Sequence, residues 1–348
     1  MIPTKLQIYG DKRLELFKNL VEYRAHIIRK PCYLPTIQWL SREYRTYLYK
    51  GRPCIIQSHP DDYESIDILT DYFTESERLK AKRVDREWSP QEYWDTHYDQ
   101  LVQKTLERSG CSDPIELRDQ LWHEGLECSS FKLSLAKAVY EIFGAKRILD
   151  ISAGWGDRLL AAIAHGVERY VGFDPNTNLE HGHNEIIEYF SKDKDRYSVF
   201  YEPFETASLS NSDRYNLIFS SPPYYDLENY TDLPGQSIQN YPDFNDWMVG
   251  FLFKSLLKSW NQLEIDGHMV IHICDYYKTH YVEAMIMFVL GWCPGSYFDG
   301  VIGSVGASRK ARPMWVFRKN KISSLNHTAR EDLERYYPEL YSRISLLD

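Results

Sequence analysis

Two features are scarce in this chain of 348 residues: cysteines spaced for metal or disulfide chemistry, and long apolar runs. The six cysteines are scattered without a C-x-x-C pair, so reduced thiols are expected rather than a zinc site or a disulfide framework. No apolar run approaches the length of a membrane span, and the N-terminus has no signal-peptide pattern. We therefore expect an intracellular protein, cytoplasmic or nuclear, with no metal site and no membrane partner.

Residues 147–157, Arg-Ile-Leu-Asp-Ile-Ser-Ala-Gly-Trp-Gly-Asp, read as a buried strand that enters a glycine turn and then a helix. Gly154 and Gly156 would let the backbone approach a ligand closely. Asp174 follows a second apolar strand, where its carboxylate can accept both hydroxyls of a ribose. Leu159 stands where a dinucleotide-binding turn has its third glycine, so a pyrophosphate ligand is a poor match.

A second pattern follows the apolar run 217–220, which ends in the tetrad Ser221-Pro222-Pro223-Tyr224. Alone, Pro-Pro after a strand is usually only a stop signal. The tetrad also carries useful chemistry, because the Ser221 hydroxyl and the Pro222 carbonyl can hydrogen-bond an amine. Tyr224 offers a flat face on which a base can stack.

Glycine turn, acidic residue and tetrad, in this order, resemble the amino-methyltransferases that use S-adenosylmethionine to methylate exocyclic amines of nucleobases. The resemblance covers residues 129–320 and implies an α/β fold, the class I Rossmann-like methyltransferase with a mostly parallel doubly wound sheet. It assigns catalysis to the tetrad, Ser221, Pro222, Pro223 and Tyr224. The S-adenosylmethionine site that it implies comprises Asp150, Ser152, Gly154, Gly156, Asp174, Glu202, Phe204 and Phe131. Ser152 and Trp155 depart from the family pattern and put the shape of the pocket in question.

The target base is indicated by the first residue of the tetrad. Serine is common among the cytosine-N4 enzymes of this family, and its hydroxyl can donate to cytosine N3 while accepting from N4. DNA cytosine N4 is therefore the favoured target. Adenine N6 in DNA or RNA, including an mRNA cap, is the first alternative. The second is a non-catalytic subunit that keeps the methyltransferase fold as a binding or structural module.

Charge is distributed unevenly, although the net charge is −9. Residues 1–60 contain eleven Lys and Arg against four Asp and Glu, which gives 11 − 4 = +7 and leaves −9 − 7 = −16 for the remainder. Cations next to aromatic rings suit a nucleic-acid surface, so Arg42 and Arg45 are candidate phosphate contacts. A second basic cluster near the last predicted strand contributes Arg309 and Arg312. The alternative is that the neighbouring tyrosines are core and the charges a solvated face.

The pattern of elements predicts three regions: a mainly helical, initially basic substrate-recognition region at 1–128, a methyltransferase domain at 129–320, and a helical C-terminal tail at 321–348. A helix is expected near 13–28, another at 131–143 and a third over 244–263. The expected strands lie near 147–151, 169–173, 197–201, 215–220, 268–274 and 312–318. His268 and His272 fall on one of these strands and are expected to be ordinary residues. Oligomeric state is not indicated.

Overall fold

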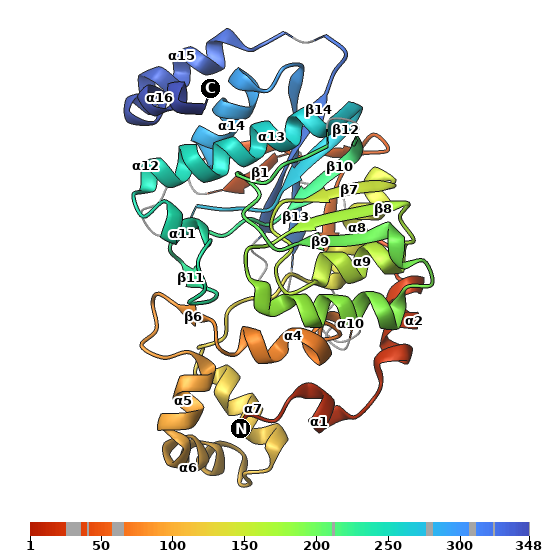
Figure 1. Ribbon diagram of the computed structural model, residues 1–348, viewed down its shortest axis with the longest axis vertical. Coiled ribbons are helices and arrows are strands. Elements are labelled where there is room, and N and C mark those ends of the chain that lie inside the picture. The colour runs from red at the N-terminus through yellow and green to blue at the C-terminus, as the bar shows by residue number, and fades with distance from the viewer. Residues whose placement is uncertain are drawn as a thin grey trace.

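The computed structural model describes residues 1–25, 36–39, 42–57, 66–210, 213–275, 281–305, 311–322 and 324–347. Its centre is an eight-stranded sheet in the order β5-β13-β14-β12-β10-β7-β8-β9 (Figure 1). The strands of this sheet are β5 Ile55–Gln57, β7 Arg147–Asp150, β8 Arg169–Phe173, β9 Tyr197–Phe200, β10 Tyr215–Ser220, β12 Leu263–Ile271, β13 Ser296–Val305 and β14 Ala311–Lys319.

The sheet is mostly parallel. Strands β9, β8, β7, β10 and β12 run in one direction, and β14 is antiparallel to both β12 and β13. Counted from β7 in chain order, the strands lie in the order 3-2-1-4-5-7-6. This is the doubly wound order with a reversed last strand inserted beside the fifth. The fold is the class I Rossmann-like methyltransferase fold, as the sequence predicts.

Helices cover both faces of the sheet (Figure 1). One face packs on α8 Leu133–Phe143, α9 Asp157–His165, α10 Glu180–Phe190 and α2 Arg13–Glu22. The other face packs on α13 Lys254–Gln262 and α14 Val282–Trp292, and α15 His327–Tyr336 and α16 Pro338–Ile344 pack on the outer side of this layer. Successive residues of a strand point to opposite faces of the sheet, so Ile148 belongs to the first core and Leu149 to the second.

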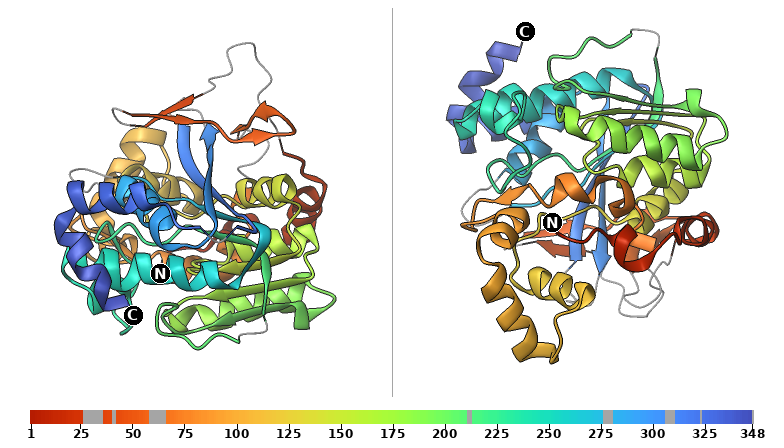
Figure 2. Two further views of the ribbon diagram at one scale, coloured as in Figure 1. Left: turned by 90° about the horizontal axis from the view of Figure 1, so that it is seen from above. Right: turned by 60° about the horizontal axis from the view of Figure 1, so that its bottom comes forward.

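Part of the region before α8 is held against the sheet, whereas the helices between residues 90 and 123 pack around a separate core (Figure 1). Strand β5 forms the edge of the main sheet, paired in parallel with β13. Two short hairpins, β1 Thr36–Trp39 with β2 Arg42–Arg45 and β3 Leu48–Tyr49 with β4 Arg52–Pro53, lie nearby, and β1 and β2 contact β14 and β13 (Figure 2). The helices of this region are α1 Lys5–Tyr9, α4 Asp71–Arg78, α5 Pro90–Thr96, α6 Tyr98–Ser109 and α7 Pro114–His123.

Several elements differ from the sequence prediction. Strand β12 spans Leu263–Ile271 instead of 268–274, and the region before residue 128, expected to be mainly helical, also contributes the strands β1 to β5. The helix expected over 13–28 ends as α2 at Glu22. The stretch 244–263 divides into α12 Phe244–Asp246, a π-helical segment η3 Trp247–Phe253, and α13. Strand β13 was not predicted, because Gly300 and Gly303 interrupt its apolar pattern, and the pairing is bulged near Gly300.

The remaining elements are short: β6 Lys82–Arg83 pairs with β11 Glu228–Asn229, and α11 Ser237–Asn240 follows. Within the described ranges, no helix combines the length and the apolar character needed to cross a membrane.

Candidate active site

Three polar residues follow three parallel strands at the same edge of the sheet, two of them adjacent (β10 and β12) and the third (β8) separated from β10 by β7. Asp174 comes after β8, Ser221 after β10 and His272 after β12. Because the carboxyl ends of parallel strands meet at one edge, these side chains gather at the place where doubly wound sheets bind ligands. A cavity of about 380 Å³ lies there, and its wall includes all three.

The glycine turn forms the floor of one end of this cavity. Gly154 has φ +59 and Gly156 has φ +97, a backbone region that side chains disfavour. The His183 ring nitrogen Nε2 lies 2.9 Å from the Gly154 carbonyl oxygen, and Nδ1 lies 3.1 Å from the Tyr201 hydroxyl oxygen. Burial lowers the pKa of His183 to about 4, so the ring is neutral and can donate from Nε2 to the turn.

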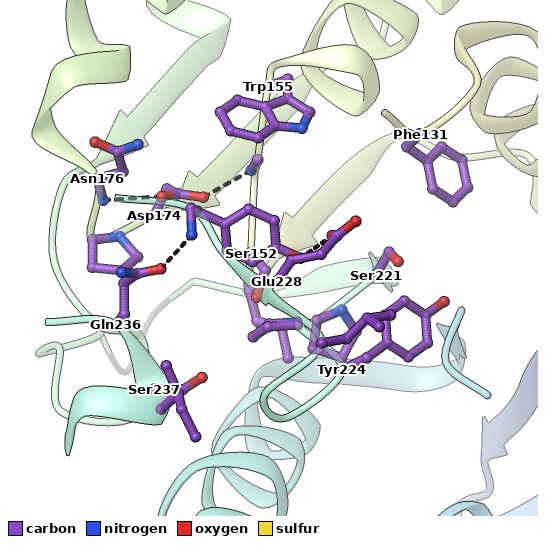
Figure 3. Close-up of a pocket in the computed structure, with 18 of the residues that line it drawn as sticks. Phe131, Ser152, Trp155, Asp174, Asn176, Ser221, Tyr224, Glu228, Gln236 and Ser237 are labelled. Atoms are coloured by element: carbon purple, nitrogen blue, oxygen red, sulfur yellow. Dashed lines mark hydrogen bonds between the residues drawn. The ribbon is translucent and has the colours of Figure 1, made fainter. Parts of the chain in front are cut away.

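Asp174 holds the opposite side of the turn. Its carboxylate accepts hydrogen bonds from the backbone amides of Gly154 at 2.8 Å and Asn176 at 3.0 Å (Figure 3). Burial raises the pKa of Asp174 to about 6. The Asn176 side chain is 3% exposed and lines the cavity, and its amide nitrogen has no hydrogen-bond partner among the described residues. An unused donor therefore lies beside the acid.

Asp150 lies beneath the cavity rather than on its wall. It is fully buried and accepts hydrogen bonds from Arg158 at 2.7 Å, Tyr170 at 2.8 Å and Ser220 at 2.8 Å. Arg158 also donates to the carbonyl of Ser152, which lines the cavity. Asp150 therefore has a structural role: its hydrogen bonds hold β7, β8, β10 and α9 together.

The other predicted cofactor residues divide into two groups. Phe131 and Phe204 line the cavity, and the Phe131 ring lies 5.2 Å from the Arg158 guanidinium carbon. Glu202 is exposed and does not line the cavity. Glu205, one helical turn further on, lines it instead and is 3% exposed, with one carboxylate oxygen lacking a hydrogen-bond partner among the described residues.

All four tetrad residues line the end of the cavity opposite Asp174. In Figure 3, Ser221 and Tyr224 lie on the side of Phe131, with Asp174 and Asn176 across the pocket. The Ser221 hydroxyl donates to the His272 carbonyl oxygen at 3.1 Å. Tyr225, next after the tetrad, has φ +51, a strained conformation that fits a turn constrained by its surroundings.

Trp155 and Tyr230 form part of the cavity wall. Trp155 is 6% exposed and packs edge-on against Tyr230 at 5.8 Å between ring centroids. Helix α4 supports the turn from behind: Thr74 donates to the Trp155 carbonyl at 2.9 Å, and Thr70 donates to Asp157 at 2.6 Å. The large ring that departs from the family pattern therefore fills the junction between the N-terminal region and the cofactor turn.

The predicted nucleic-acid contacts are not gathered at one place. Arg312 lines the cavity, and its charge adds to the effect of burial in lowering the pKa of His272. Arg45 lies near the amino end of β13, where it donates to the Phe298 carbonyl at 2.9 Å. Arg42 belongs to β2, but its side chain lies outside the described part of the structure, as does Arg309 altogether. 

Two tyrosines of this part of the chain, Tyr44 and Tyr47, are half-buried and pack against the core. Tyr44 packs edge-on against Trp315 at 4.7 Å between centroids, and Tyr47 packs on Phe143 at 5.2 Å. These two rings are therefore not displayed as stacking platforms, which favours the solvated-face alternative for this part of the chain.

Three polar residues of the site lay outside the sequence prediction: His183, Asn176 and His272. His183 is set by packing between α10 and the turn, which no local pattern reveals. Asn176 carried a usable signal, because it lies just beyond a predicted parallel strand, whereas His272 fell inside the predicted strand 268–274 and was expected to be an ordinary residue. No group of three or more His, Cys, Asp or Glu within the described ranges could hold a metal ion.

No protein-family model and no curated protein sequence matches the chain. Among solved structures, it is similar to TrmN from Thermus thermophilus, with 15% identity and a TM-score of 0.37 over 55% of this chain and 50% of that one. An rRNA methylase from Streptococcus thermophilus matches at 11% identity and a TM-score of 0.36, over 51% and 87%. A glycopeptide N-methyltransferase, MtfA, matches at 12% identity and a TM-score of 0.37, over 53% and 94%. The match spans half the length of the Thermus protein, and at these identities nothing of the neighbours' substrates transfers to this chain.

Proposed function

We propose that this chain is an S-adenosylmethionine-dependent methyltransferase that methylates an exocyclic amine of a nucleobase in nucleic acid, with cytosine N4 in DNA as the favoured target. One observation carries the proposal: a single cavity joins the glycine turn and Asp174 at one end to the Ser-Pro-Pro-Tyr turn at the other. A donor site and an acceptor site for group transfer thus share one enclosed space.

The donor end fits S-adenosylmethionine. Gly154 and Gly156 let the backbone approach the ligand, and the ionised Asp174 can accept both ribose hydroxyls. The amide nitrogen of Asn176 and one carboxylate oxygen of Glu205, which have no partner in the part of the chain that the structure describes, are buried polar atoms that a ligand would satisfy. When bound, S-adenosylmethionine supplies an electrophilic methyl group on a sulfonium.

The methionine end of the donor would lie toward Ser152 and Phe131, which line the cavity between the turn and the tetrad. Asp150 and Gly156, which do not line it, would act by shaping the turn. Phe204 contributes an apolar wall for the adenine.

The acceptor end can hold and activate an aromatic amine. Such an amine is a poor nucleophile because its lone pair is delocalised into the ring. Hydrogen bonds accepted by the Ser221 oxygen and the Pro222 carbonyl would concentrate electron density on the nitrogen, and Pro223 keeps the turn rigid. The ring of Tyr224 provides the face for stacking.

Nucleic acid would approach through the open side of this end. A base in a duplex must leave the stack to reach the tetrad, at a cost of a few kcal/mol. Arg312 is the predicted phosphate contact that lies on the cavity wall, so it is the best placed to hold the backbone of an extruded nucleotide. Residues 1–128 are proposed as the region that contacts the rest of the substrate.

Adenine N6, in DNA or RNA, is the alternative target, and the direction of one hydrogen bond supports it. The Ser221 hydroxyl already donates to the His272 carbonyl. Its oxygen is then left to accept from an amine N–H, which adenine N6 and cytosine N4 supply equally well.

Transfer of an isotope-labelled methyl group tests the proposal. The purified protein is incubated with labelled S-adenosylmethionine and, separately, with DNA, RNA and base-biased single strands, and the nucleosides are analysed by mass spectrometry. We expect 4-methylcytosine from DNA. Detection of 6-methyladenine alone would change the proposed target base to adenine and leave the proposed reaction unchanged. Donor binding without labelled product on any polymer would favour the non-catalytic alternative.

A further inference from the structure

His272 lies against the tetrad because of the way two strands are paired. Strands β10 and β12 are parallel neighbours with Ser220 opposite Ile271, and the His272 amide donates to the Ser220 carbonyl at 2.9 Å. The next residue on each strand, Ser221 and His272, must therefore face each other. The contact is fixed by the sheet and does not depend on a loop.

Two hydroxyl groups converge on this histidine. Nδ1 of His272 lies 3.1 Å from the Ser221 hydroxyl oxygen and 3.2 Å from the Tyr224 hydroxyl oxygen. The Ser221 hydroxyl oxygen also lies 3.1 Å from the carbonyl oxygen of His272. One residue thus offers two acceptors, a carbonyl oxygen and a ring nitrogen, to the two hydroxyls of the tetrad.

The charge state of the ring decides which atoms donate. Burial lowers the pKa of His272 to about 3, and the nearby cations Arg312 and Arg158 lower it further. Burial also raises the pKa of Tyr224, so that hydroxyl keeps its proton. A neutral ring has one bare nitrogen, and we assign it to Nδ1 because both hydroxyls converge on that atom. Nδ1 then accepts from Tyr224, while the Ser221 proton is directed to the carbonyl. The Phe131 ring, edge-on at 5.2 Å between centroids, limits rotation of the imidazole.

We propose that His272 is a positioning residue of the transfer site, which holds the protons of the Ser221 and Tyr224 hydroxyls away from the acceptor so that oxygen lone pairs face an incoming N–H. The inference rests on the proposed function and deepens it. It also defines which acceptor groups the site selects. A group that carries an N–H can donate a hydrogen bond to the Ser221 oxygen, whereas an atom at the same place that has only a lone pair is repelled by the lone pair of that oxygen. Ser221 therefore reads the amine and not the ring nitrogen beside it, which replaces the donation to cytosine N3 that the sequence suggested.

Two substitutions separate this role from packing. His272→Phe keeps a ring of similar size and removes Nδ1. His272→Asn places an amide oxygen close to the position of Nδ1 and can accept from Tyr224. His268→Asn, on the same strand β12 but outside the cavity wall, is the matched control.

For His272→Phe we expect kcat to fall by about tenfold or more with S-adenosylmethionine affinity unchanged, because the lost hydrogen bond acts on transfer and not on donor binding. His272→Asn should recover most of the rate, to within about threefold of the native protein, and His268→Asn should not alter it. Full activity in His272→Phe, or equal loss of rate in the Phe and Asn variants with both folded, would overturn the proposal.

Nitrogen-15 NMR of the imidazole tests the same hydrogen bonds without turnover. The resonance missing from His272→Phe should be that of a neutral ring with an unprotonated, hydrogen-bonded Nδ1 across about pH 5 to pH 9. A protonated Nδ1, or titration within that range, would contradict the assignment. Because this measurement needs no substrate, failure of the proposed methylation and failure of the His272 assignment are distinguishable.

Discussion

The carboxylate of Asp174 accepts a hydrogen bond from the backbone amide of Gly154 at 2.8 Å, so the acid after β8 and the turn after β7 hold each other in place. The acid thus has two tasks in the proposed site: to accept ribose hydroxyls and to fix the glycine turn. The pKa of Asp174 is raised to about 6 by burial, which places its titration within an accessible range.

Affinity for S-adenosylmethionine should therefore depend on pH through Asp174. Hydroxyl donors of the ribose favour the ionised carboxylate, so binding should be tight above about pH 6 and weaken by about tenfold per unit as pH falls below it. Calorimetry between about pH 5 and pH 8 measures the effect. Asp174→Asn should bind more weakly and without this dependence, and Asp174→Ala should lose about 1–3 kcal/mol of binding free energy. A flat profile in the native protein would remove Asp174 from the ribose site.

A second titration couples the N-terminal region to the cofactor turn. Asp157 accepts a hydrogen bond from Thr70 at 2.6 Å, and burial raises its pKa to about 7 from an ordinary value of 3.8. Between these values the folded protein holds a proton that the unfolded chain has released. The contribution of Asp157 to the free energy of unfolding is therefore fully present below about pH 4 and is lost as pH rises to about 7, by about 1.4 kcal/mol per unit.

Denaturant unfolding at about pH 5 and pH 8 tests this sign. Asp157→Asn, which cannot ionise, should remove the loss between the two conditions. Thr70→Val is the matched variant at the other end of the hydrogen bond: it should lower stability at both values. If Asp157→Asn keeps the native pH dependence, another group is responsible.

Local patterns predicted the part of the fold that consists of continuous apolar strands. Residues 147–150, 169–173, 197–200 and 215–220 form strands close to where the sequence placed them, because each is a short apolar run bounded by polar residues. Strand β13 escaped because Gly300 and Gly303 break its pattern, and β5 because three residues are too few to show a period. The place of β5 at the sheet edge comes from pairing with β13, which is more than 240 residues away in the sequence.

The residues of the candidate site also divide into those that local sequence patterns reveal and those that they do not. Gly154, Asp174 and Ser221 belong to local patterns whose spacing is visible in the sequence. His183 and His272 join them only because distant elements pack together, so isolated histidines gave no reason to be singled out. The composition of the basic, tyrosine-rich start of the chain is compatible with both of its interpretations: it suits nucleic acid, and it also suits a segment whose rings, such as Tyr47, pack against the core.

The two described arginines that were predicted to contact phosphates should behave differently. Arg312 lies on the cavity wall, whereas the guanidinium of Arg45 donates to Phe298 near the amino end of β13. In nucleic-acid binding measured over a salt series, Arg312→Gln should lower the slope of log affinity against log salt by about one. Arg45→Gln should leave it close to native. The opposite result would move the substrate path to the β2 side of the molecule.

Tyr224 offers a way to separate stacking from hydrogen bonding at the acceptor end, because its ring lines the cavity while its hydroxyl reaches His272 at 3.2 Å. Tyr224→Phe keeps the face for the base and should reduce kcat only moderately, by about threefold to tenfold. Tyr224→Ala loses the face as well and should lower kcat/KM further, by about 1–3 kcal/mol in transition-state stabilisation. Ser221→Ala should lower kcat by about tenfold or more, since its oxygen must accept more strongly as the amine gains charge.

Donor affinity is the internal control for these variants, because the contacts proposed for the ribose come from the turn after β7 and from Asp174. Calorimetry should give the native value in all three variants, and steady-state transfer assays give the rates. Equal loss in Tyr224→Phe and Tyr224→Ala would mean that the hydroxyl matters and the ring face does not. Robust transfer by a variant carrying both Ser221→Ala and Tyr224→Ala would exclude the tetrad from the reaction and move the acceptor site elsewhere in the cavity.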